Sequence, residues 1–141
     1  MASALFNSFK RDIMNGGLDL DTDTIKAQLH TSTFAQNIDT MTKRSDLTNE
    51  ASGTGYTAGG ASLANKAVTV DNTNDRGVFD SDDLSWSSAS ITARYVVLYK
   101  SRGGASSADE LIGSWDMGSD IVSTAATFAV AVNANGWLLA S

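Results

Sequence analysis

The chain has 141 residues, no cysteine and a formal net charge of −6. Its length suits one domain with a substantial core, and a content of 42% hydrophobic and 18% charged residues is typical of a globular chain. Without cysteine, neither a disulfide framework nor a thiolate metal site can form. The 10 lysines and arginines are scattered among 16 acidic residues, which argues against nucleic acid as a partner.

The first residues, MASALFNSFKRDIMNGG, show neither a basic leading region nor a cleavage-like site, so we expect no signal peptide. No apolar run approaches the roughly 18 residues that a membrane span requires. We therefore expect no membrane partner. The same stretch predicts a short helix, because apolar residues recur in it at helical spacing behind a candidate cap, Ser3: Leu5, Phe6, Phe9 and Ile13.

Gly16 and Gly17 are expected to end this helix. We interpret residues 1–17 as an N-terminal helical arm and residues 18–141 as a β-sandwich domain. The apolar stripe of the arm has to pack on something, either on its own domain or on a neighbouring subunit.

After residue 18 the hydrophobic period changes to two, which indicates strands. The stretch SITARYVVLYK, residues 90–100, is apolar on both faces, so it belongs in the middle of a sheet or at a subunit interface. Residues 38–52 predict a long loop with one helical turn after Ser45, and NTNDRG, residues 72–77, predicts a turn. The expected strands cover residues 25–31, 68–70, 78–79, 84–86, 90–100, 111–117, 128–132 and 137–141. Seven or eight strands with one helix favour an all-β fold, a β-sandwich or jelly roll in a single domain.

Three aspartates at every second position, Asp19, Asp21 and Asp23, raise the question of a calcium loop. An EF-hand loop needs glycine at its sixth place and glutamate at its twelfth, and here those places hold Thr24 and His30. We therefore expect the aspartates to accept backbone N–H bonds in a turn that leads into a strand.

A second acidic group, Asp80, Asp82 and Asp83, could hold a hard cation or supply an acid and a base. The alternative is a solvated turn before the strand of Trp86, which we favour. We expect no bound metal at either group.

The glycine-rich stretch GTGYTAGGAS, residues 53–62, resembles nucleotide-binding loops only in spacing. Gly53, Gly55 and Ala58 fit a loose dinucleotide pattern, but no strand precedes them and no helix follows. For a phosphate loop, Ala61 stands where lysine is required. We expect these glycines to permit positive φ or a close approach of two backbones.

His30 is the only histidine, and alternation places it on the polar face of its strand, so we expect it to be exposed. A serine or cysteine nucleophile usually needs a histidine base, and catalytic zinc needs several histidines. Trp86 and Trp115 follow the apolar faces of their strands and are expected in the core, whereas Trp137 fits either a core or a binding role. We expect no catalytic residue, no enzymatic activity and no cofactor.

Five segments together resemble the cement, or capsid decoration, proteins of tailed phages and prophages: DTDTIK, SGTGYTAGGASLANK, FDSDDLSW, SITARYVVLYK and LIGSWDMGSD. The resemblance runs from about Phe9 to Leu139, and it departs from the family pattern at QNIDTMTKRSDL, residues 36–47. It implies a mostly β subunit that assembles as a small homo-oligomer on the outer surface of the head, after synthesis in the host cytoplasm. It brings no catalytic residues.

From this resemblance we expect a structural virion protein whose partners are the major capsid protein and further copies of itself. We favour a homodimer, because two-fold oligomers are the commonest closed form, and a homotrimer is the second choice. Leu5, Phe6, Phe9 and Ile13 are the expected interface residues. Two alternatives stay open: a tail or host-surface module that binds carbohydrate, and a small hydrolase that uses the two aspartate groups with a metal.

Overall fold

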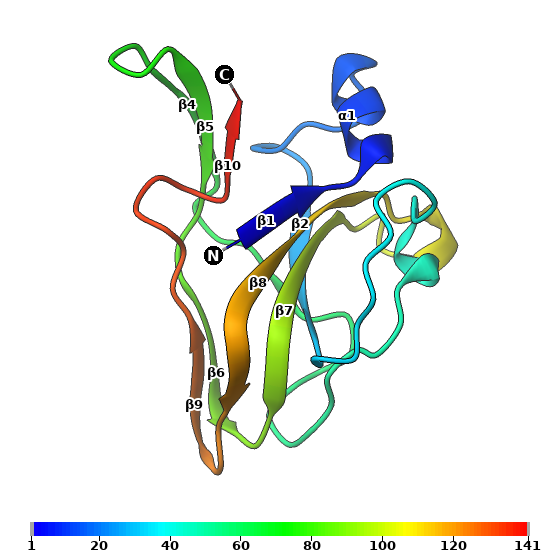
Figure 1. Ribbon diagram of the computed structural model, residues 1–141, viewed down its shortest axis with the longest axis vertical. Coiled ribbons are helices and arrows are strands. Elements are labelled where there is room, and N and C mark those ends of the chain that lie inside the picture. The colour runs from blue at the N-terminus through cyan, green and yellow to red at the C-terminus, as the bar shows by residue number, and fades with distance from the viewer. Residues whose placement is uncertain (1, 141) are drawn as a thin grey trace.

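The structure is a computed structural model that describes residues 2–140. Met1 and Ser141, the outer limits of the two expected segments 1–17 and 18–141, lie outside the described residues. Between residues 2 and 140 the chain forms ten strands, one α-helix and two short 3₁₀ turns (Figure 1). The predicted all-β fold with one short helix is confirmed.

Five strands form the main sheet, in the order β1 (Ala2–Leu5), β8 (Leu111–Val122), β7 (Thr92–Lys100), β2 (Ile25–His30) and β3 (Ala61–Ser62). All neighbours in it are antiparallel. Strand β7 lies in the middle, and its residues 96–99 are buried, which confirms the prediction from its two apolar faces.

The other strands form two smaller sheets. Strand β5 (Arg76–Asp80) lies between β10 (Leu138–Ala140) and β4 (Ala67–Asp71), and β6 (Leu84–Ala89) pairs with β9 (Ala126–Val130). Residues 72–75 form the turn between β4 and β5, within the predicted turn region. Figure 1 shows the β4–β5 hairpin at one end of the molecule and the tips of β6 and β9 at the other.

Buried side chains from all three sheets form one sandwich-like core, which contains close aromatic pairs. Trp86 of β6 meets Phe128 of β9 with ring centroids 6.1 Å apart, and Trp115 of β8 meets Trp137 at 5.1 Å. Both contacts are edge-to-face, the arrangement that aromatic quadrupoles favour. The expected core positions of Trp86 and Trp115 are confirmed, and Trp137, left open by the sequence, is also a core residue.

The N-terminal segment differs from the prediction. Residues 2–5 form strand β1, in which Ser3 lies opposite Trp115, and the helix α1 begins only at Asn7 and ends at Met14. Phe6 occupies the cap position, which has no side-chain cap, so the expected capping role of Ser3 is wrong. Backbone pairing with the edge of β8 prevails over the helical spacing, because it satisfies N–H and C=O groups of β8 that would otherwise lie unpaired.

Polar contacts hold the long loop of residues 43–60 against the main sheet. The predicted helical turn lies earlier than expected, since η1 (Arg44–Asp46) contains Ser45 and does not follow it. This turn brings the Arg44 Nε to 2.8 Å from Asp109 Oδ2, next to the turn η2 (Ser106–Ala108). The Tyr99 hydroxyl donates to the Gly59 carbonyl at 2.6 Å, and burial raises the pKa of Tyr99 to about 12. The loop is thereby fixed to the centre of the sheet.

Candidate functional site

The first aspartate group forms a turn before β2, as the sequence indicates. Asp19 Oδ1 accepts the backbone N–H of Asp21 at 3.3 Å, and the Asp19 N–H donates to Asp23 Oδ2 at 2.8 Å. Asp23 also pairs with Lys100, whose Nζ lies 2.8 Å away. The proximity of the two carboxyls lowers the pKa of Asp19, which can accept a hydrogen bond from a protonated Asp21, and raises the pKa of Asp21.

The second aspartate group does not converge on one point. Asp80 Oδ1 accepts the Ser81 N–H at 2.8 Å, whereas Asp82 Oδ2 accepts from the Asn65 side chain at 2.6 Å. Asp83 Oδ1 accepts the Val132 N–H at 2.7 Å, 49 residues away along the chain. Each carboxylate therefore fastens a different local segment. Within residues 2–140 no three acidic, histidine or cysteine side chains gather as a metal site.

The glycine-rich stretch serves the close backbone contacts that the sequence predicts. Gly60 has φ +76°, and a Cβ built on it would lie 1.7 Å from the Ala27 carbonyl oxygen of β2. Gly53 has φ +148°, and its Cβ would lie 2.0 Å from the Ser90 carbonyl oxygen. These glycines let the loop lie directly on neighbouring backbone, and they need no nucleotide to explain them.

His30 is fully buried, so the prediction of an exposed histidine is wrong. Its Nδ1–H donates to the Thr48 carbonyl at 2.8 Å, and its ring packs on Phe34 at a centroid distance of 4.6 Å. Both contacts come from segments outside β2, and alternation within β2 contains no information about them. Burial lowers the pKa of His30 below its ordinary value of 6.5.

This buried histidine predicts a loss of stability in mild acid. Below pH 6.5 the unfolded chain takes up a proton that the folded chain resists, so the free energy of unfolding falls with pH by up to about 1.4 kcal/mol per unit. Carboxylates titrate mainly below about pH 5, so between about pH 6.5 and 5 the slope comes from His30. Urea unfolding across this range measures it.

The variant His30→Asn keeps an N–H donor near Thr48 and removes the titrating ring, so its stability is expected to stay flat over the same range. An equal slope in the variant and the parent would contradict the assignment to His30.

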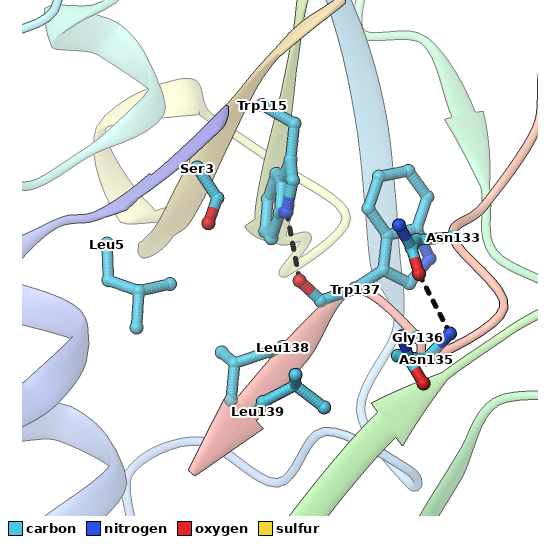
Figure 2. A pocket seen from close by; sticks show the side chains of 9 residues that line it. All are labelled: Ser3, Leu5, Trp115, Asn133, Asn135, Gly136, Trp137, Leu138 and Leu139. Carbon is cyan, nitrogen blue, oxygen red and sulfur yellow. Dashed lines mark hydrogen bonds between the residues drawn. The ribbon is translucent and has the colours of Figure 1, made fainter. Parts of the chain in front are cut away.

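Trp115 and Trp137 line a cavity of about 260 Å³ between β1 and β10 (Figure 2). Trp115 Nε1–H donates to the Trp137 carbonyl at 2.9 Å, and Trp137 Nε1–H donates to Ser81 Oγ at 2.8 Å. Asn133 and Asn135 form the polar side of the cavity, joined by an N–H bond of 2.9 Å. Both indoles are buried, so the cavity offers amide groups and the edges of core rings.

The expected interface residues separate into two sets. Phe6 and Phe9 are buried in the core of the domain, and Leu5 is half-buried against the same core. Ile13 is exposed, and so is its neighbour Met14. In this domain the N-terminal stripe is therefore mostly internal packing, and only the end of α1 is free to meet a partner.

Strand β4 exposes two further large apolar side chains that the sequence analysis missed. Val68 and Val70, on the same side of β4, are 52% and 77% exposed, and Ile13 and Met14 are 40% and 80% exposed. We call these four residues the α1–β4 face. The sequence predicted a strand at residues 68–70, and it gave no sign that this strand lies at the edge of its sheet.

A groove of about 430 Å³ joins the two parts of the α1–β4 face. Ile13 and Val68 line it together with the buried side chains of Leu18 and Leu20. The remaining lining residues are Gly16, Asp19 and Asp21, so the groove is apolar inside and carries two carboxylates and no lysine or arginine.

Comparison of the chain with models of protein families, with curated proteins and with solved structures finds no match in any of the three. In the described part of the chain, no helix has the length and apolar character needed to span a membrane.

Proposed function

We propose that this protein is a structural component of a tailed-phage virion, a cement or decoration protein that binds the outside of the head. It bridges neighbouring major capsid subunits as a small homo-oligomer, a dimer first and a trimer next. The proposal assigns it no reaction. It also places the protein in the host cytoplasm before assembly and on the capsid surface afterwards.

The α1–β4 face is the observation that carries the proposal. Four large apolar side chains are exposed at one end of the domain. The other side chains considered as site residues, by contrast, make contacts within the fold. His30 lies in the core, and carboxylates in both aspartate groups, such as those of Asp19 and Asp83, accept hydrogen bonds within the domain. Exposed apolar side chains rimmed by polar residues mark protein interaction sites, and here Ile13 and Val68 line one groove with Asp19 and Asp21. The resemblance of five segments to capsid decoration proteins suggests that the partner is the major capsid protein.

The mechanism we propose is multivalent binding. Each subunit binds one shell subunit weakly, and the second contact of an oligomer gains from the high effective concentration that the first creates. A rigid β domain suits this role, because little conformational freedom is lost when the second contact forms. Outward pressure that separates shell subunits is then resisted by a clamp that holds both.

Sedimentation of the purified protein with undecorated heads tests the proposal. We expect the protein to sediment with the heads at a saturating ratio near one copy per shell subunit, and to be oligomeric by light scattering when free. A strict monomer that stays in the supernatant at saturating concentration would rule out the bridging role.

The cavity between β1 and β10 favours a second candidate, a carbohydrate-binding module of a tail or host-surface protein. Tryptophan edges beside two asparagine side chains and Ser3 are groups that sugars contact. Titration with glycans, followed by tryptophan fluorescence, discriminates between the candidates. A saturable change would support the module, and an unchanged spectrum with retained head binding would remove it.

A further inference from the structure

The α1–β4 face has the properties of a surface that is covered in use. Strand β4 is an edge of its sheet, and all its residues from Ala67 to Val70 are exposed. Edge strands are usually protected by lysine, proline or a bulge, and β4 instead presents Val68 and Val70. An exposed apolar edge strand favours association with another chain. Binding of a partner there is favourable because it removes apolar surface from water.

The negative charge of the groove indicates which side chains the partner should present. Asp19 and Asp21 line the groove beside Ile13 and Val68, and the contact between the two carboxyls already raises the pKa of Asp21. Lys66 is near enough to favour the charged form of Asp21, but it does not line the groove. A lysine or arginine side chain from a partner would relieve the repulsion between the two carboxylates and complete the electrostatic match.

A second copy of the chain is the poorer occupant. A two-fold contact places the same patch on both sides, so the groove of one copy would bring Asp19 and Asp21 against the same carboxylates of the other. Like charges across an interface oppose binding. The net charge of −6 adds to this repulsion at longer range.

We propose that the α1–β4 face is the docking surface for the shell, and that it binds a protein surface presenting an apolar side chain beside a lysine or arginine. This inference rests on the proposed function and adds the contact residues and the chemistry of the partner. The apolar side chain enters the groove between Ile13 and Val68, and the basic group pairs with Asp19 and Asp21.

Binding of variants to undecorated heads tests the docking surface. The double variant Ile13→Ser with Val68→Ser removes two apolar walls, and it is expected to weaken binding by about tenfold or more. Its matched control, Ile121→Ser with Val122→Ser, changes the same residue types at the exposed C-terminal end of β8. In Figure 1 that end of β8 lies at the opposite end of the molecule from α1 and β4. The control is expected to bind within about twofold of the parent.

The charge of the groove is tested with Asp21→Asn, against Asp120→Asn as an exposed control on β8. Removing a charge at the rim of an interface mainly changes the association rate and the salt dependence, so Asp21→Asn should weaken binding by about threefold at low salt. The difference from the parent should shrink as salt rises. Val70→Ser provides an independent apolar test, since this residue is 77% exposed and its loss does not disturb the core.

The outcomes separate the inference from the function on which it rests. If the parent protein fails to bind heads, both the function and the docking surface are wrong. If the parent binds and the Ile13, Val68, Val70 and Asp21 variants bind equally well, the docking surface is wrong and the function stands. If these variants instead dissociate the free oligomer, the face binds a second copy, and the proposed basic partner is wrong.

Discussion

Replacing Gly60 with alanine is expected to lower the free energy of unfolding by about 2–5 kcal/mol, the sum of a left-handed backbone penalty and overpacking. Gly60 has φ +76°, and an added Cβ would lie 1.7 Å from the Ala27 carbonyl oxygen. The loop of residues 53–62 would have to leave β2, whose pairing with β3 begins at that point. Urea unfolding followed by far-UV circular dichroism measures the loss.

Gly103→Ala is the matched control for this variant. Gly103 has φ +80°, nearly the same backbone conformation, but no atom lies within 4 Å of its added Cβ. It should therefore lose only the backbone penalty, about 1–2 kcal/mol. Equal losses at the two glycines would show that the close contact between the loop and β2 contributes nothing to stability.

Phe6→Ala is expected to cost about 3–5 kcal/mol of the free energy of unfolding, as do other truncations of fully buried aromatic side chains. Phe6 is fully buried, and its N–H donates to the Ile112 carbonyl of β8 at 3.2 Å. Truncation leaves a cavity between α1 and the main sheet. Thermal or urea unfolding of the isolated protein measures this loss without any head present.

Ile13→Ser, on the same helix, should change stability by no more than about 0.5 kcal/mol, because Ile13 lies at the surface. The pair of variants therefore separates internal packing from partner binding within one apolar stripe. If Phe6→Ala left stability unchanged and abolished head binding, Phe6 would be an interface residue, as the sequence first suggested.

Much of the sheet could be predicted, because β strands alternate visibly in this chain. The apolar run of β7 identified the central strand, and the glycines of residues 53–62 identified a loop pressed on neighbouring backbone. Strands β1 and β3 were missed for a different reason. Each is short and is defined by its pairing with a strand distant in sequence, and local periodicity contains no record of such a partner.

His30 and Val68 show the corresponding limit for side chains. Alternation assigns a residue to one face of a strand, and it does not say whether another segment covers that face. Thr48 and Phe34, both outside β2, contact His30 and it is buried, whereas Val68 at the edge of its sheet is 52% exposed. The candidate docking surface could be recognised only after β4 was placed at the edge of its sheet.

The central claim is that this protein stabilises a shell by bridging its subunits, and the most direct measurement is the temperature at which heads release their DNA. Heads saturated with the protein are predicted to release DNA at a higher temperature than undecorated heads, and the Ile13→Ser, Val68→Ser variant should fail to raise it at the same concentration. Fully occupied heads that release DNA at the same temperature as bare heads would contradict the claim.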